Sequence, residues 1–205
     1  MAFQPYLASA MAGHDEYLGH LVVASIAVDE NAERALLDLA KRRRSEREIG
    51  KLKEALLAIV PCEIITVSPK SFNKIAAKTE SSEAVTAWAI EKSLANLLKP
   101  YRSYDQIALV ESAPLALLKE SMDKHGHSLS FHKDAPRKVL AAAQTIAIIS
   151  RQEKMVQLSE ELGVELPTKA NEVESFARAY LKREGKAGLS YVAKLSFALT
   201  AKLLQ

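Results

Sequence analysis

The sequence is poor in the residues that mark several classes of protein. Its single cysteine, Cys62, excludes an internal disulfide and a cysteine-rich zinc site, and a lone thiol is typical of a reducing compartment. Seven glycines and seven prolines among 205 residues exclude collagen-like and low-complexity chains. No apolar run reaches the about 18 residues of a membrane-spanning helix, so no membrane contact is expected. These absences predict a cytoplasmic globular protein.

An excess of one charge is also missing. Lys and Arg number 28 against 25 Asp and Glu, which gives a formal net charge of +3. This small excess is compatible with a nucleic-acid partner but does not require one. Hydrophobic residues make up 48% and charged residues 26%, proportions that exclude wholesale disorder.

Apolar runs rich in branched residues predict the strands of a sheet. Residues 3–11 and 21–28 flank a turn that contains Gly13 and Gly19, and we expect them to form a hairpin. The first run has no basic residues before it and leads directly into acidic residues, so we expect a buried strand and not a signal peptide. The other expected strands are 62–68, 107–110 and 129–131.

Helical spacing and capping residues predict the helices. Asn31 is expected to cap one helix, and Ser45-Glu46-Arg47-Glu48 has the S-x-x-E form of a capping box that begins another. Gly163 is expected to end the longest helix, because glycine tolerates the left-handed conformation. The expected helices are 31–40, 45–60, a short one from Pro69, one from Ser81 or Ser82 to 98, 115–124, 138–162, 170–184 and 188–204, with a break at Gly185.

The order of these elements predicts the fold class. Strands fall early in the chain and helices cover them later, which favours one α/β domain with a mixed sheet flanked by helices. Within that single domain, 1–205, we expect residues 1–150 to form the mixed-sheet core. Residues 151–205 are expected to form a helical C-terminal extension of it.

Short motifs follow one another along nearly the whole chain. Residues 141–151 read AAAQTIAIISR, 155–167 read MVQLSEELGVELP, 193–200 read AKLSFALT, 66–73 read TVSPKSFN and 19–23 read GHLVV. In this order they resemble the AVAAASIIAR, M-x-x-L-S-x-x-x-G-x-x-L-P, AKLHFxNT, LSPEKYN and G-P-L-V-V segments of the type 2 ribonuclease H family. Within its HII/HIII group, the HIII branch is the most similar. We expect the N-terminal substrate-binding domain typical of that branch to be absent.

The resemblance implies a ribonuclease H-like fold and a specific chemistry. Members of the family hydrolyse the RNA strand of an RNA/DNA hybrid with two Mg²⁺ or Mn²⁺ ions held by carboxylates. Such hard cations need several oxygen ligands that converge on one point. The chemistry therefore depends on three or four acidic side chains.

Apolar residues stand where the resemblance places these acids. Aligned without gaps, the D-E pair of the first strand falls on Ala10 and Met11, and the central aspartate of I-D-Q-F falls on Val110. The D-S-K step falls on Ala40, and the K-A-E step has only an ambiguous match at Asp134. Dications that face apolar walls are unpaired charges, which cost several kcal/mol or more. We therefore expect no metal cofactor and no catalytic residue.

A relocated site is the alternative. Asp15 and Glu16 form another D-E pair, while Glu111 and Asp134 could supply further oxygens for Mg or Mn. This site requires a shortened glycine turn and a local bulge, because adjacent strand residues such as Val110 and Glu111 point to opposite faces. It would make the protein an active, diverged metal-dependent endoribonuclease.

Contacts to nucleic acid are also implied by the resemblance. The G-x-G segment of the family brings backbone close to the ribose 2′-OH, but here Gly13 is followed by Asp15 in place of the second glycine. A carboxylate there would repel phosphate. For the basic positions, a solvated surface or salt bridges are the alternative. The candidate nucleic-acid-binding residues are Gly13, His14, Arg42, Arg43, Lys133 and Arg151.

Three other features have structural interpretations. We expect Trp88 to pack in the core and not to stack on bases, and Cys62 to be a small core residue. The histidines at 125, 127 and 132 fit a polar loop better than a metal site. The sequence thus favours an inactive ribonuclease HII/HIII-like protein that binds nucleic acid, an RNA/DNA hybrid or a duplex, or a protein partner.

Overall fold

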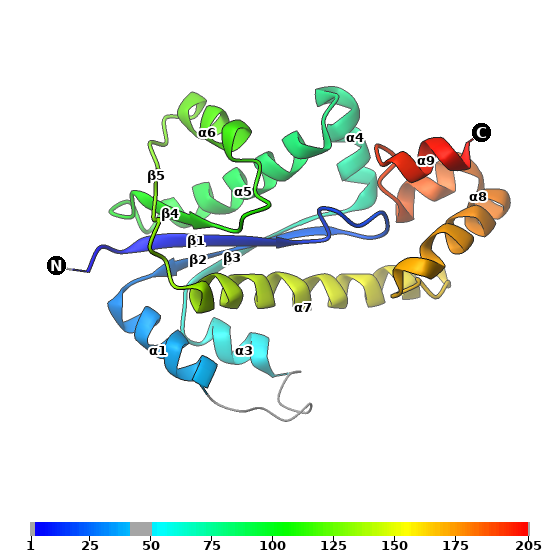
Figure 1. Cartoon of the computed structure of the whole chain (residues 1–205). Coiled ribbons are helices and arrows are strands. Elements are labelled where there is room, and N and C mark those ends of the chain that lie inside the picture. Colours follow the sequence, from blue (N-terminus) through cyan, green and yellow to red (C-terminus); the bar gives the residue numbers. More distant parts are fainter. Residues whose placement is uncertain (1–2, 42–50, 205) are drawn as a thin grey trace.

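Five strands form one mixed sheet in the computed structural model, which describes residues 3–41 and 51–204 (Figure 1). The strand order is β3-β2-β1-β4-β5. β2 pairs antiparallel with β1 and β3, whereas β4 pairs parallel with β1 and β5. The predicted hairpin and mixed sheet are confirmed. The strands are β1 (Tyr6–Ala12), β2 (Leu21–Val28), β3 (Cys62–Val67), β4 (Gln106–Leu109) and β5 (Ser130–Phe131).

Helices cover both faces of this sheet (Figure 1). In that view α4, α5 and α6 lie above the sheet, α1, α3 and α7 lie below it, and α8 and α9 lie beyond its right-hand end. None of the helices in the described ranges is long and apolar enough to cross a membrane. The helices are α1 (Glu30–Lys41), α3 (Leu52–Leu57), α4 (Pro69–Thr79), α5 (Ser82–Leu98), α6 (Leu115–Lys124), α7 (Arg137–Leu162), α8 (Ala170–Val192) and α9 (Ala198–Leu203).

β1 is buried along its whole length because both of its faces are covered. Alternate residues belong to different cores: Ala8 and Ala10 pack with the α7 layer, while Leu7 and Met11 pack with the α4–α6 layer. This is the period of two expected for a strand. Ala142, Ala143 and Ala147 of α7 are buried in the core that includes β1, and these small side chains allow the helix to approach the sheet closely.

A third core lies at the C-terminal end of the chain. It joins the end of α7 to α8 and α9, and it includes Tyr17 and Leu18 from the β1–β2 turn. α7 passes residue 150 without a break, so the expected boundary between core and extension falls inside one helix. Gly163 ends α7 in the left-handed conformation, as predicted.

The prediction of a helix over 188–204 is wrong. α8 contains the expected break at Gly185 but ends at Val192, and α9 begins only at Ala198. Between them the chain is extended, because Ala193 forms a β-bridge with Leu18 and the Lys194 amide donates to the Tyr17 carbonyl at 2.9 Å. Pairing with a distant turn therefore overrides the local helical pattern.

Two further predictions need correction. Asp29, not Asn31, caps α1, since its carboxylate accepts a hydrogen bond from the Ala32 amide at 2.8 Å. Trp88 is 39% exposed and does not pack in the core. The capping box at 45–48 lies outside the described residues. Ser81 caps α5 by accepting from the Ala84 amide.

Candidate nucleic-acid interface

The turn between β1 and β2, residues 13–20, is called the glycine loop below. Gly13 and Gly19 have φ values of +81° and +78°, which favour glycine. A Cβ at Gly13 would overlap the His20 carbonyl oxygen and the Arg151 side chain. A Cβ at Gly19 would overlap the Met155 sulfur. Both glycines therefore allow close packing of the loop against itself and against α7.

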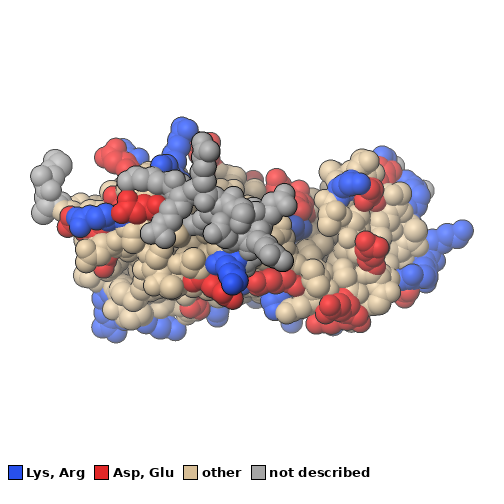
Figure 2. Space-filling view, turned by 90° about the horizontal axis from the view of Figure 1, so that it is seen from below, with Lys and Arg blue, Asp and Glu red and all other residues tan. Residues whose placement is uncertain are grey.

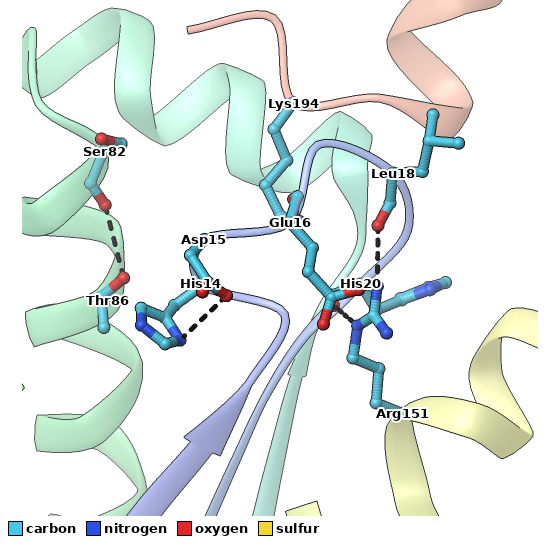
Figure 3. A network of polar contacts seen from close by, with 9 residues as sticks. All are labelled: His14, Asp15, Glu16, Leu18, His20, Ser82, Thr86, Arg151 and Lys194. Atoms are coloured by element: carbon cyan, nitrogen blue, oxygen red, sulfur yellow. Dashed lines mark hydrogen bonds and ion pairs between the residues drawn. The ribbon is translucent and has the colours of Figure 1, made fainter. Parts of the chain in front are cut away.

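Arg151 of α7 holds the glycine loop in place (Figure 3). Its guanidinium donates to the Leu18 carbonyl at 2.9 Å and to the His20 carbonyl at 3.1 Å. It also forms an ion pair with the Glu16 carboxylate at 2.6 Å, and its side chain is only 13% exposed. These contacts match the salt-bridge interpretation of Arg151, because most of its donors already serve the loop. A direct contact between Arg151 and phosphate stays a prediction.

Lys194 supports the loop from the opposite side (Figure 3). The side chain is fully buried, and its ammonium donates to the Glu16 carbonyl. Its Nζ also lies 5.6 Å and 5.7 Å from the ring centroids of Phe72 and Phe197. Burial and the neighbouring charge of Arg151 lower the pKa of Lys194 to about 7, while Glu16 and Asp15 act in the opposite direction. Sequence reasoning missed this residue, for which the only signal was its place in the AKLSFALT segment.

The two histidines of the loop differ in their surroundings. Burial lowers the pKa of His20 to about 4, and the positive charges of Lys154, Lys194 and Arg151 act in the same direction. His20 is therefore neutral at pH 7. The Nδ1 atoms of His14 and His20 are buried without a hydrogen-bond partner in the described part of the chain. The Nδ1 atom of His14 lies 3.6 Å from the carboxylate of Asp15, the next residue along the chain.

The term strand ends is used below for three residues. Ala10 and Met11 lie in β1 just before the glycine loop, and Val110 follows β4. Ala10 and Met11 are buried in β1, and Val110 follows β4 with its amide donating to the Ser9 carbonyl at 3.4 Å. The parallel register pairs Ser9 with Leu109, so the next residues of the two strands are neighbours. None of the three side chains carries an oxygen. The donor set at the strand ends therefore does not fit Mg²⁺ or Mn²⁺.

The four relocation candidates do not come together. Asp15 is 73% exposed, Glu16 is paired with Arg151, and Glu111 and Asp134 are exposed on separate segments. Asp134 precedes the start of α7, whereas the glycine loop contacts α7 at Arg151. These two points of the helix are roughly 21 Å apart at 1.5 Å per residue. Within residues 3–41 and 51–204, no cluster of three His, Cys, Asp or Glu side chains could hold a metal.

Lys133 lies apart from the loop. Lys133 is exposed near the start of α7, and Arg42 and Arg43 lie outside the described residues. His125 lies 2.5 Å from the Glu91 carboxylate, while His132 contacts Gln106 and stacks on the ring of Tyr6. His125 and His132 thus have separate partners, in agreement with the polar-loop interpretation. Burial raises the pKa of the Cys62 thiol to about 12, as suits a core residue.

A cavity of about 810 Å³ opens beside the glycine loop. The loop, the second half of α7 and the start of α8 form its walls, including Glu16, Arg151, Met155 and Val173. The underside of the molecule is not uniformly charged: in Figure 2, Lys and Arg side chains are interspersed with Asp and Glu. The loop, and not a broad basic surface, is therefore the distinctive feature of this region.

Comparison with known proteins gives the fold a context. Ribonuclease HIII of Streptococcus pyogenes serotype M5 (strain Manfredo) is 26% identical over 211 residues, which cover 97% of this chain and 70% of that protein. The crystal structure of Bst-RNase HIII in complex with Mn²⁺ superposes with a TM-score of 0.80 at 22% identity, covering 98% of this chain and 69% of that one. The chain has a ribonuclease HIII-like fold. The resemblance to the type 2 ribonucleases H is confirmed.

The ribonuclease HIII-like fold extends to the HII proteins. Ribonuclease H2 from Pyrococcus horikoshii OT3 superposes with a TM-score of 0.70 at 19% identity, covering 97% of this chain and 96% of that one. No protein-family model matches the sequence. The fold is thus retained over the whole chain, although the strand ends lack the oxygen ligands that the resemblance implies.

Proposed function

We propose that this protein binds nucleic acid, an RNA/DNA hybrid or a duplex, without hydrolysing it. The observation that carries the proposal is the apolar character of the strand ends within a ribonuclease HIII-like fold. Ala10, Met11 and Val110 stand where the resemblance places the metal-binding acids. Two-metal hydrolysis needs carboxylates at this point, both to activate water and to stabilise the leaving oxygen.

The contacts that hold the glycine loop in place support binding of nucleic acid. The loop is held by Arg151 and Lys194 through contacts that need no metal. Its Gly13 packs against Arg151, which lies in the middle of α7, and exposed Lys133 precedes the start of that helix. A duplex is long enough to contact both points, because its helical repeat spans about 34 Å. The relatives in the comparison are named ribonuclease HIII.

The Asp15 carboxylate changes what the loop selects. It is exposed and replaces the second glycine of the family's segment, so it repels a phosphate that approaches the loop. We therefore expect weaker discrimination between RNA and DNA strands than a glycine at this position would give. Asp15→Gly should strengthen hybrid binding.

The test combines a binding and a cleavage assay on the purified protein. A hybrid with a labelled RNA strand is incubated at low salt with Mg²⁺ or Mn²⁺, and with EDTA in parallel. We expect a gel shift that weakens with salt, and an intact RNA strand in every lane. Metal-dependent cleavage that is lost in Asp15→Asn/Glu16→Gln would instead establish the diverged nuclease.

A matched pair of variants tests the binding surface. Lys133→Gln should weaken hybrid binding and reduce its salt dependence, because one phosphate contact is removed. Lys182→Gln on α8 removes the same charge from an exposed position outside the interface and should have no effect. If hybrid, duplex and single strands all fail to bind at low salt, the protein-partner alternative replaces this proposal.

A further inference from the structure

A groove lies on the layer of α4, α5 and α6, on the opposite side of the sheet from α7 (Figure 1). Its volume is about 550 Å³, within the range of small-molecule sites. Its lining is largely apolar and includes an aromatic side chain. The residues that matter here are Ile75, Lys78, Ala87, Trp88, Leu117 and Lys124.

Trp88 is exposed for a clear structural reason. The neighbouring positions Ala87, Ala89 and Ile90 of α5 are buried against the sheet, which leaves Trp88 on the outward side of the helix. Exposed apolar surface that gathers in a groove commonly marks an interaction site. Ile75 and Leu117 from α4 and α6 also line the groove, but Trp88 remains 39% exposed.

The charges around this ring favour an anionic occupant. Lys78 and Lys124 line the groove, and the Lys92 ammonium lies 6.0 Å from the centroid of the Trp88 ring. Among the described lining residues, Glu120 is the one carboxylate, and it is paired with Lys124 at 2.7 Å. Among the described lining residues, Lys78 is therefore left without a carboxylate partner, and Lys92, which is not part of the lining, adds a second positive charge near the ring.

We propose that this groove binds a segment of single-stranded nucleic acid, with a base stacked on Trp88 and phosphates held by Lys78 and Lys92. Stacking on an aromatic ring accepts any base, and neighbouring amines neutralise the backbone. The Lys92 ammonium lies next to the Trp88 ring, so one nucleotide can stack its base on the ring and place its phosphate near the ammonium. An acidic peptide could match the charges, but it has no planar ring at each residue to match the indole.

This site is separate from the glycine loop and does not depend on the function proposed above. The groove belongs to the α4–α6 layer, whereas Gly13 packs against Arg151 of α7 and Lys133 precedes the start of α7. A protein could bind single strands at the groove and fail to bind hybrid at the loop, or the reverse. The two proposals can therefore fail independently.

Intrinsic fluorescence gives a direct readout, because Trp88 is the only tryptophan in the chain. The wild-type protein is titrated with short oligothymidylate and oligouridylate at low salt. We expect saturable quenching of the tryptophan emission, with an affinity that falls as salt rises. This measurement uses the unmodified protein, so it does not depend on how any variant folds.

Variants then identify the contacts, with binding followed by the anisotropy of a labelled oligonucleotide. Trp88→Leu should weaken binding about tenfold, while Trp88→Phe keeps most of the affinity because it keeps a ring. Lys78→Gln and Lys92→Gln should each lower the slope of log affinity against log salt by about 0.7. Lys182→Gln, on the surface of α8, is the matched control and should change nothing.

Two outcomes would overturn the proposal. The first is oligonucleotide binding without quenching and with unchanged affinity in Trp88→Leu, which would place single strands elsewhere. The second is quenching by an acidic leucine-containing peptide but by neither oligonucleotide, which would make the groove a protein-docking site. Unchanged hybrid binding in Trp88→Leu, together with lost single-strand binding, would support the separation of the two sites.

Discussion

The strand ends and the glycine loop are neighbours along the chain but are stabilised by different forces. At the strand ends, Ala10 and Met11 fill the space with apolar groups that belong to two different cores. In the loop, Arg151 and Lys194 instead bind backbone carbonyls with charged groups. The contrast shows how the loop can keep its position without a metal beside it, since its contacts come from α7 and from the segment after α8.

The largest effect should come from making the strand ends acidic. Ala10→Asp/Val110→Asp places two carboxylates together in a mostly apolar site, so we expect a loss of about 4 kcal/mol in the free energy of unfolding at pH 7 with EDTA. Mn²⁺ should restore part of this loss by pairing the charges. Urea unfolding with and without Mn²⁺ measures both effects.

Ala10→Asn/Val110→Asn is the control for volume and polarity. It should be less destabilised and should not respond to Mn²⁺, because amide groups lack the charge that attracts the ion. If the aspartate variant is as stable as the wild type in EDTA, the strand ends are not the apolar site described here.

Removing the arginine should damage the loop almost as strongly. Arg151→Met leaves the Leu18 and His20 carbonyls and the Glu16 carboxylate without their partner, so we expect a loss of about 3 kcal/mol. Arg178→Met removes an exposed ion pair with Glu174 and should cost less than about 1 kcal/mol. Chemical denaturation compares the two variants, and equal losses would show that Arg151 does not hold the loop.

The loop glycine can be compared with a helix-ending glycine. Gly13→Ala adds a methyl group where the His20 carbonyl and Arg151 already lie, whereas Gly163→Ala meets no atom within 4 Å. Both have positive φ, so both should lose about 1–2 kcal/mol from backbone strain. Gly13→Ala should lose about 1 kcal/mol more from overpacking. Thermal unfolding ranks the two, and a larger loss for Gly163→Ala would contradict the packing of the loop.

The buried lysine should make stability depend on pH. Its pKa is about 7 in the folded protein, below the usual value, so the unfolded chain binds more protons between pH 7 and 9. Stability therefore rises with pH through this window, by up to about 1.4 kcal/mol per pH unit. Lys194→Met should remove this slope, which urea unfolding at several pH values measures. A slope unchanged in the variant would mean that another group titrates.

Much of the fold was predictable because its signals are local. The β-branched run 21–28 gave β2, and Gly163 marked the end of α7. Failures arose where distant contacts decide the structure: Ala193 leaves the helical pattern to pair with Leu18, and Trp88 faces solvent because α5 buries its neighbours. No sequence pattern reports which side of a mostly apolar helix meets the sheet.

The site was predictable only in part for the same reason. The ungapped alignment identified Ala10, Met11 and Val110 as lacking oxygen ligands, and the structure places these residues side by side at the strand ends. It could not show that Arg151 is occupied by loop carbonyls, or that Lys194 is buried against two aromatic rings. Both facts depend on the docking of segments more than 120 residues apart along the chain, Arg151 with the loop and Lys194 with Phe72.

Titration of the wild-type protein with Mn²⁺, followed by the electron paramagnetic resonance signal of the free ion, tests directly whether the strand ends hold a metal. The strand ends offer no side-chain oxygen ligands, so the signal should grow with the protein alone as it does in buffer. A saturable loss of signal that disappears in Asp15→Asn/Glu16→Gln would show that the protein holds a metal and would contradict the account.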